Sequence, residues 1–509
     1  MKKLFCLLLA ALLMLSAAAC GRNENRGSTL IYGSNDYTRI NPALDEHGEI
    51  NILIFDGLTA HGKNNAIEAR LAERWEINDT ATVYTFHLRR DVKWHDGEAF
   101  TAQDVKFTYE AIMDPENGSE NASNYEDVTS ITIPDDYTVT FTLSAPNYAF
   151  LDYMTMSILP EHILAGKDLQ TDEFFRSPIG TGPYKLEKWD AGQAITLRKN
   201  DDYFLGAANI ETIVFKIVPD DSAKALQLKS GELDLALLTP KDAATFAGIE
   251  GYTTYHMQTS DYRGILYNFR NEFWQKNADL IPAISYAIDR QAMVDSVLLG
   301  QGEVAYSPIQ RNEYNYESTE RYDYDPAKAE QLLVNAGCVK GEDGFYCRDG
   351  ERIRFTINAS AGDQVRIDMA LIAAQQLRAI GLDVNAAVPE SMDWGGQECC
   401  IIGWGSPFDA DDHTYKVFGT DKGANYSGYS NLLVDRYLTE ARQTGDSAKR
   451  AEAYKNFQIE LAKAPAYTFF CYLDAMYVGN SGIQGIDRAT VLGHHGVGIF
   501  WNVRSWTLG

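Results

Sequence analysis

Two adjacent histidines stand among three glycines near the end of the chain, in the stretch Leu492-Gly493-His494-His495-Gly496-Val497-Gly498. In a regular strand, neighbouring side chains point to opposite faces, so two such imidazoles could not reach one ion. Glycine adopts positive φ readily, and glycines on either side of the pair would let both rings turn toward one point. Neutral imidazole is a ligand for nickel, copper, zinc and iron. The stretch therefore predicts a metal-binding prong made of His494 and His495; the alternative is a solvated surface pair, the commoner state of such loops.

The predicted elements in the second half of the chain alternate between strand and helix. A strand is predicted at Ile353–Asn358, an amphipathic helix at Arg366–Ile380 with Gly381 as its C-cap, and a second strand at Val384–Ala387. This order is typical of a parallel α/β sheet with right-handed crossovers.

Other stretches also have the apolar patterns of strands and helices. Leu30–Gly33 is a short apolar strand, and Tyr84–Arg89 alternates apolar and polar residues as a half-buried strand does. A helix is predicted to begin after Thr101, which can cap it, with Asp104 in the first turn where negative charge is favoured. Ala283–Arg290 also has helical apolar periodicity.

The first 20 residues have the composition of a targeting segment and not of a folded element. Lys2 and Lys3 precede the apolar run Leu4–Leu15, which is too short to span a bilayer. The segment resembles a bacterial lipoprotein signal that is cleaved before Cys20, and residues 21–28 would then form a polar tether. We therefore expect an exported protein that a lipid on Cys20 anchors to the cell membrane.

Length and charge restrict the classes of protein. A chain of 509 residues exceeds one ordinary core, so two or three domains are expected. A formal net charge of −26 argues against a nucleic-acid partner, which would require a basic face.

Five cysteines follow Cys20, and export would permit disulfides between them. Cys338 and Cys347 flank a turn-rich stretch, where a hairpin disulfide is plausible. Cys399, Cys400 and Cys471 would leave one thiol over, and their spacing matches no zinc pattern.

Several motifs resemble, in the same order, those of the extracellular solute-binding proteins of family 5, which serve oligopeptide, dipeptide and nickel importers. The matching stretches are Tyr84–Tyr109, Ile158–Leu164, Pro178–Lys185, Asn200–Phe204 and Leu226–Asp234. Each motif alone is weak, but the set is specific, and the resemblance runs from residue 29 to the end of the chain.

The resemblance implies an α/β fold of the two-lobe periplasmic-binding-protein type II class (cluster C), with mixed sheets flanked by helices and an extra subdomain in the first lobe. Lobe I would comprise residues 29–255 and 480–509, with the subdomain inserted at about 55–174, and lobe II residues 256–479. It also implies an extracytoplasmic monomer whose partners are an ABC permease and its ATPase subunits.

The ligand is not determined by the fold, because the family binds peptides, nickel chelates, opines and sugars. Peptide-binding members commonly carry an aspartate for the peptide ammonium after a Gly-Trp pair. Here the segment reads Gly403-Trp404-Gly405-Ser406-Pro407-Phe408-Asp409, with Pro407 at the aligned position and Asp409 two residues later. This form, together with the histidine pair, resembles the nickel-binding members.

By this resemblance, His494 and His495 would leave metal positions open for a small chelator such as free histidine. The carboxylate of the chelator would need a cation, for which Arg366 is the first choice and Arg263 the second. Trp404 would form a wall of the cleft. Surface ion pairs for the arginines, and plain core packing for Trp404, are the alternatives.

The sequence thus predicts a lipid-anchored binding component of an ABC importer that captures a nickel(II) chelate and is not an enzyme. No Ser/His/Asp, Cys/His or Glu-based hydrolytic motif stands out. A peptide-binding protein of the same fold is the main alternative. A surface metalloenzyme that uses the histidine pair is another, although the helical motif of two histidines and a carboxylate is absent.

Overall fold

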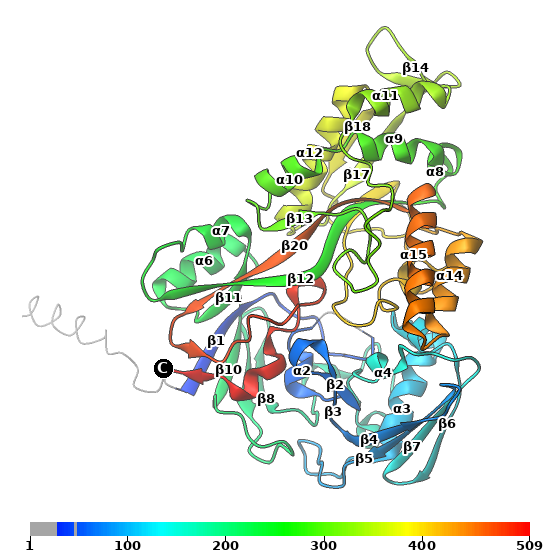
Figure 1. Ribbon diagram of the computed structural model, residues 1–509. Helices are drawn as coiled ribbons and strands as arrows, with labels where there is room; N and C mark the ends of the chain where they lie inside the picture. Colours follow the sequence, from blue (N-terminus) through cyan, green and yellow to red (C-terminus); the bar gives the residue numbers. More distant parts are fainter. Residues whose placement is uncertain (1–27, 45–47) are drawn as a thin grey trace, which may run out of the picture.

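The centre of the molecule is a mixed sheet that runs through both of its halves (Figure 1). The structure, a computed structural model, describes residues 28–44 and 48–509. Within these residues the sheet has eleven strands, in the order β18-β17-β19-β12-β20-β11-β1-β10-β9-β8, with β13 beside β20. The strands are β1 (Thr29–Ser34), β8 (Tyr184–Asp190), β9 (Ala194–Lys199), β10 (Thr212–Ile217), β11 (Leu235–Leu238), β12 (Tyr252–Tyr267), β13 (Gly302–Val304), β17 (Arg354–Asn358), β18 (Asp383–Ala387), β19 (Cys399–Ile402) and β20 (Tyr467–Asn480).

Two long antiparallel strands, β12 and β20, connect the two halves (Figure 1). They have 16 and 14 residues, so β12 spans roughly 50 Å at about 3.3 Å per residue. Register shifts interrupt their pairing between Gln258 and Tyr262 and between Arg263 and Gly264. Such irregularities bend a strand locally. The two lobes therefore share one continuous sheet that is bent at its middle, and the expected two-lobe α/β fold is confirmed.

The first lobe carries an additional four-stranded antiparallel sheet in the order β4-β5-β7-β6. Its strands are β4 (Ala72–Ile77), β5 (Val83–Leu88), β6 (Val128–Asp135) and β7 (Thr138–Leu143), and helix α3 (Ala102–Met113) packs on β6 and β7. Thr101 and Asp104 form a capping box at the start of α3, as the sequence predicted.

The second lobe contains the predicted strand-helix-strand unit. Helix α12 (Gln364–Ile380) connects β17 to β18, which are parallel, and Gly381 ends the helix at φ 101°. The helix predicted at Ala283–Arg290 is wrong, because the chain forms two short helices there, α9 (Ile281–Tyr286) and α10 (Arg290–Ser296). Asp289 breaks the continuity, since its side chain accepts the Ala292 N–H at 3.0 Å and caps α10.

The remaining elements cover this framework. The other helices are α2 (Asn51–Ile54), α4 (Phe150–Tyr153), α5 (Glu161–Leu164), α6 (Asp221–Ser230), α7 (Pro240–Ala244), α8 (Glu272–Asn277), α11 (Pro326–Asn335), α13 (Tyr415–Phe418), α14 (Leu432–Arg442) and α15 (Ser447–Lys463). The short strands are β2 (Thr59–His61), β3 (Ile67–Ala69), β14 (Val339–Lys340), β15 (Tyr346–Arg348), β16 (Glu351–Arg352), β21 (Ile483–Gln484) and β22 (Thr507–Leu508). In the described part of the chain, no helix has both the length and the apolar character to cross a membrane.

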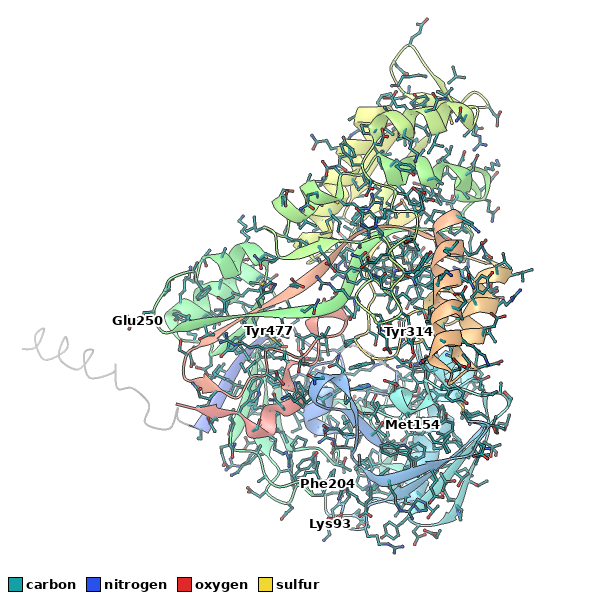
Figure 2. All side chains as sticks on the ribbon, in the orientation of Figure 1. Lys93, Met154, Phe204, Glu250, Tyr314 and Tyr477 are labelled. Atoms are coloured by element: carbon teal, nitrogen blue, oxygen red, sulfur yellow. The ribbon has the colours of Figure 1, made fainter. Side chains whose placement is uncertain are left out.

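Buried apolar side chains form separate clusters in the two lobes. One cluster joins the first lobe to its added subdomain, for example Phe86, Phe141 and Ile213, and another contains Ile284 and Leu377 of the second lobe. Side chains fill both lobes, with Met154 and Tyr314 on opposite sides of their boundary (Figure 2). Each lobe therefore has its own core, as expected for two bodies that move against each other.

The turn-rich stretch between Cys338 and Cys347 forms the predicted hairpin of β14 and β15, but the two thiols are not bonded. Val339, and not Cys338, lies opposite Cys347, so the two cysteines are not cross-strand partners in the hairpin. Cys399, Cys400 and Cys471 are also free and buried. The proposed lipidation site, Cys20, lies in residues 1–27, outside the described residues.

Candidate functional site

The histidine pair lies in the short 3-10 segment η7 (His494–Gly496), which packs against β12 near its register shift. The centroids of the two imidazole rings are 3.9 Å apart. The backbone that brings them together differs from the expected one. Positive φ occurs at His495 itself (57°), Gly496 (71°) and Gly498 (116°), whereas Gly493 has φ −78°. The left-handed conformation of His495 turns its ring onto the side of His494.

A buried carboxylate, Asp261 of β12, holds both histidines. Its Oδ1 lies 2.7 Å from Nδ1 of His494, and its Oδ2 accepts the backbone N–H of His495 at 3.0 Å. Nη1 of Arg263 donates to Oδ1 at 2.5 Å. Burial alone would raise the pKa of Asp261, but Arg263 and His494 outweigh it and hold that pKa well below its usual value. Asp261 is therefore an anion that fixes η7 against the sheet.

This contact determines which nitrogen of His494 can bind a ligand. When neutral imidazole donates its Nδ1–H to a carboxylate, the lone pair is on Nε2. Metal-ligating histidines usually have such a carboxylate or carbonyl behind them, which fixes the tautomer and the ring orientation. His494 therefore has the arrangement of a metal ligand that binds through Nε2.

His495 is held in its neutral form. Its side chain reaches solvent, but the protein surrounds it on its other sides, and this burial is the main reason that its pKa lies well below its usual value. A positive charge on His494, when that ring is protonated, and the charges of Arg263 and Arg366 lower the pKa further, whereas Asp261 raises it. A neutral imidazole is the form that a metal ion requires.

Trp404 and His413 complete the surroundings of His494. The Trp404 ring stacks on His494 at 5.6 Å and 25°, and it is 3% exposed. His413 lies edge-on to both rings, and its Nδ1 accepts the backbone N–H of Gly405 at 3.1 Å. Trp404 thus supports His494 from behind, and His413 is a third imidazole beside it.

The two predicted arginines lie behind the histidine pair. Arg263 is 3% exposed and Arg366 is 5% exposed. Nε of Arg366 is 3.0 Å from Oδ2 of Asp363. Burial, followed by the positive charge of Arg263, lowers the pKa of Arg366. The structure therefore places both arginines beside the histidines, where they act on His495 through their charge.

A cavity of about 340 Å³ lies between the lobes in front of His494. This volume is in the usual range for a small-molecule site. His494 and His413 line it, together with His61 and Asp152 of the added subdomain, whereas Trp404, Arg263, Arg366 and His495 do not. Its wall includes Pro407, whose carbonyl accepts a hydrogen bond from Nδ2 of Asn65 at 3.2 Å.

The aspartate near Pro407 is engaged elsewhere. Both oxygens of Asp409 accept hydrogen bonds from Arg450, at 2.5 and 2.6 Å, in a bidentate pair. Asp409 is also absent from the cavity lining. The segment that holds the ammonium in peptide binders therefore supplies no free carboxylate to this cavity.

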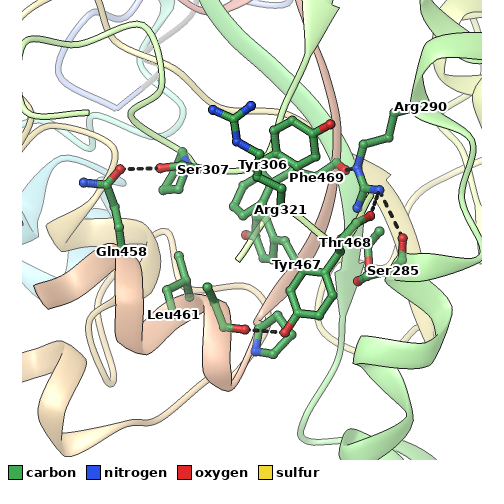
Figure 3. Close-up of a pocket in the computed structure, with 14 residues that line it drawn as sticks. Ser285, Arg290, Tyr306, Ser307, Arg321, Gln458, Leu461, Tyr467, Thr468 and Phe469 are labelled. Atoms are coloured by element: carbon green, nitrogen blue, oxygen red, sulfur yellow. Dashed lines mark hydrogen bonds between the residues drawn. The ribbon is translucent and has the colours of Figure 1, made fainter. Parts of the chain in front are cut away.

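A second cavity, in lobe II, is too small for a cargo. It has about 20 Å³, room for one water molecule. Beside it, the guanidinium of Arg290 donates to backbone carbonyls of Ser285, Tyr322 and Phe469 at 2.7–3.0 Å (Figure 3). Arg290 is a structural group that ties α10 to β20.

No group of three or more His, Cys, Asp or Glu side chains is arranged to hold a metal ion in residues 28–44 and 48–509. A metal bound by the histidine pair would need further ligands from a small molecule. Two residues of the cluster, Asp261 and His413, were not predicted. Asp261 could have been found from the sequence, because residues 261 and 263 of one strand point to the same face, which puts this carboxylate beside Arg263.

Comparisons with known proteins agree with this architecture. The family model of bacterial extracellular solute-binding proteins, family 5, matches residues 66–426. Protein XP55 of Streptomyces lividans is 32% identical over 469 residues, which cover 90% of this chain and 86% of that protein.

Two solved structures extend the comparison. The structure of NikZ from Campylobacter jejuni in complex with Ni(L-His) has 36% identity and a TM-score of 0.89, covering 94% of this chain and 99% of that one. The structure of the oligopeptide-binding protein AppA from Bacillus subtilis in complex with a nonapeptide has 28% identity and a TM-score of 0.86, with the same coverage.

Proposed function

Because the chain belongs to the bacterial extracellular solute-binding proteins of family 5, we propose that it captures a nickel(II) chelate between its lobes and passes it to an ABC permease. The chelate would contain nickel and a small molecule such as histidine. The protein would act as a carrier that changes no covalent bond.

The observation that carries this proposal is the geometry of the histidine pair. The centroids of two imidazole rings lie 3.9 Å apart, and Asp261 contacts Nδ1 of His494, which lines the cavity. Nickel(II) accepts nitrogen and oxygen ligands in square-planar or higher coordination. Two imidazoles would leave positions that the amino, imidazole and carboxylate groups of a histidine chelator can fill. The 36% identity to a protein crystallised with Ni(L-His) supports the same cargo.

The positive groups beside the pair would favour an anionic chelator. Arg366 remains the first choice for attracting its carboxylate and Arg263 the second, because both charges act on His495. Since both guanidiniums are buried, their contribution would be the local positive potential. Trp404 would keep the His494 ring in place.

A peptide is the second candidate cargo. A relative of 28% identity was crystallised with a nonapeptide. Asp152 and Asp412 line the cavity and could accept a peptide ammonium. The pairing of Asp409 with Arg450 argues against the usual anchor.

We also propose how the protein is placed and divided. Cys20 would carry the lipid that holds it at the outer face of the cell membrane. Lobe I would comprise residues 29–255 and 480–509 with the insert 55–174, and lobe II residues 256–479. Both junctions fall inside the long strands β12 and β20, so the hinge would be a bend of paired strands.

Calorimetric titration of Ni(II)-histidine into the tag-free protein tests the cargo. Wild-type protein should bind it, His495→Ala should bind it more weakly, and the double variant His494→Ala/His495→Ala should nearly lose binding. His87→Ala, which removes a partly exposed histidine of the added subdomain, is the matched control.

His495→Ala should have the same melting temperature as the wild type. Loss of His494 removes a partner of buried Asp261 and should therefore lower the melting temperature. Thermal unfolding therefore separates lost binding from lost folding. Near wild-type affinity in the folded double variant would place the metal elsewhere. Micromolar binding of a metal-free peptide mixture would favour the peptide cargo.

A further inference from the structure

The wall of the cavity that lobe I forms carries two cationic side chains, both close to Tyr203. Its only Lys or Arg side chains among the described lining residues are Arg70, which follows β3, and Arg504 of the 3-10 segment η8 (Ile499–Ser505). Residues 493–504 supply lining positions from His494 to Arg504, so this segment extends along the wall from the histidines to the arginines.

Arg70 is held in place without being fully paired. Its Nε is buried and finds no hydrogen-bond acceptor among the described residues. The nearest carboxylate oxygen is Oδ1 of Asp56, at 3.8 Å. A guanidinium carries five N–H donors in a planar fork that matches a carboxylate.

The acidic residue of this region is already engaged by the protein. Oδ1 of Asp56 accepts the hydroxyl of Tyr203 at 2.9 Å, and Oδ2 accepts Oγ1 of Thr181 at 3.3 Å. Asp56 is 7% exposed. Its charge acts on both arginines, and Glu68 acts on Arg70 as well, but the described chain leaves Nε of Arg70 without an acceptor.

Two further donors come from η8. The guanidinium of Arg504 lies 5.8 Å from the centre of the Tyr203 ring, and among the described residues no carboxylate lies within 4 Å of it, although Asp56 acts on it at longer range. Nε1 of Trp501 is buried and has no acceptor among the residues that the structure describes. Both side chains line the cavity. Arg504 is half-buried, so its guanidinium can meet a bound anion at the cavity wall, whereas Nε1 of Trp501 would donate to the anion only after a small shift of the indole ring.

We propose that Arg70, Arg504 and Trp501 form a second subsite in the same cavity, which binds a carboxylate of the cargo at a distance from the histidine pair. A planar carboxylate can accept two hydrogen bonds from one guanidinium. The subsite selects cargo that bears an acidic group remote from its metal-binding or amino end. This inference holds for a nickel chelate and for a peptide, so it does not depend on which cargo is correct.

A matched pair of probes isolates the distal carboxylate. Histidyl-triglycine and its C-terminal amide have the same nickel-binding end and differ only in the charge of the far end. A four-residue probe reaches about 14 Å when extended. Calorimetry should show that wild-type protein binds the nickel-loaded acid about tenfold or more tightly than the nickel-loaded amide.

Arg504→Met and Arg70→Met should reduce this preference toward one. Arg198→Met, at an exposed arginine paired on the surface of lobe I, should keep the preference. If Arg70→Met unfolds because Asp56 loses its partner, Arg504→Met carries the test. Equal binding of acid and amide by wild type, or an undiminished preference in folded Arg504→Met, would overturn the subsite.

The same two probes without nickel separate this inference from the proposed cargo. An acid preference that persists without the metal supports the subsite even if the histidine pair binds no nickel. Titration of glutarate into the Ni(II)-histidine complex then tells whether the acidic group must belong to the chelator. Binding of glutarate that Arg504→Met abolishes would show that a separate small acid can occupy the subsite.

Discussion

At the scale of single residues, the candidate metal site depends on a carboxylate that touches no cargo. Asp261 contacts Arg263, His494 and the backbone of His495 at 2.5–3.0 Å. Replacing Asp261 with Asn removes the charge and leaves Arg263 buried without a counter-ion. We expect a loss of about 3–5 kcal/mol in unfolding free energy and a fall of about 10–100-fold in nickel affinity.

Urea unfolding and calorimetry measure these two effects separately. Asp190→Asn, which changes a carboxylate at the exposed end of β8, is the control and should affect neither. If folded Asp261→Asn bound Ni(II)-histidine as tightly as wild type, orientation of His494 by Asp261 would be irrelevant to the site.

Glu49, which binds the backbone of Gly498 just after η7, makes the free energy of unfolding depend on pH. Its Oε1 accepts the hydroxyl of Tyr477 and the backbone N–H of Gly498, both at 3.1 Å. Burial raises its pKa from 4.5 to about 7. Between these values the folded state binds more protons than the unfolded state, so stability falls as pH rises through this window. The loss between pH 4.5 and pH 7 should be about 3 kcal/mol.

Glu49→Gln keeps an acceptor and removes the titration. Its unfolding free energy should therefore be nearly flat across the window in which that of wild type declines. Chemical unfolding at several pH values tests this. Parallel pH profiles for the two proteins would show that another group is responsible.

At the scale of elements, local rules predicted what local residues decide. The capping box of Thr101 and Asp104 and the C-cap at Gly381 were readable because each acts within a few positions of its helix end. The break between α9 and α10 was missed because the apolar pattern continues through it, and the side chain of Asp289 decides the ending. The hairpin disulfide was not found because register, which sequence does not give, sets Val339 opposite Cys347.

The candidate site was predictable to the same extent. His494 and His495 are neighbours in sequence, and the family resemblance pointed to Trp404, Arg263 and Arg366, which the structure places around them. Asp261 is 233 positions from His494, and Arg70 is hundreds of positions from Arg504. Only the pairing of strands and the folding of η8 along the cavity bring such residues together.

The segment that holds Trp404 and Pro407 depends on a close backbone approach at Gly405. A Cβ atom on this residue would lie 1.9 Å from the carbonyl oxygen of Ser260. Gly405→Ala should force this segment away from β12, at a cost of roughly 1–3 kcal/mol in stability, and weaken nickel binding because Trp404 stacks on His494. Gly395→Ala is the control, since its nearest atom would be 4.0 Å away.

Thermal unfolding and Ni(II)-histidine titration on both variants measure the outcome. Unchanged stability of Gly405→Ala would mean that the segment can shift freely. Its packing could not then define the position of His494.

At the scale of the whole molecule, direct contacts between the lobes close the cavity. Nζ of Lys422 donates to both oxygens of Glu126 at 2.7 Å, and the hydroxyl of Tyr426 donates to Glu120 at 2.6 Å. The ring of His61 stacks on Phe408 at 3.4 Å. In the proposed division of the chain, residues 61–126 fall in the added subdomain and residues 408–426 in lobe II, so the subdomain would provide much of the closing surface.

The buried part of this surface offers the sharpest test of closure. The hydroxyl of Tyr153 donates to Asp411, which also pairs with Arg442 at 2.6 Å. Tyr153→Phe leaves the Asp411–Arg442 pair of lobe II intact and removes only the bond between the lobes. A hydrogen bond to a charged group contributes about 1.5–3 kcal/mol, so we expect roughly tenfold or greater weakening of Ni(II)-histidine binding.

Small-angle scattering distinguishes a closure effect from a lost ligand contact, because Tyr153 also lines the cavity. At ligand concentrations that only partly saturate the variant, Tyr153→Phe should keep a larger radius of gyration than wild type, and both should contract at saturation.

Lys422→Met removes a partly exposed lobe contact outside the cavity, and should act in the same direction by a smaller amount. Weaker binding by Tyr153→Phe with wild-type scattering at equal saturation would instead make the hydroxyl a ligand contact. If the ligand produced no contraction in any variant, binding would not be coupled to closure of the lobes.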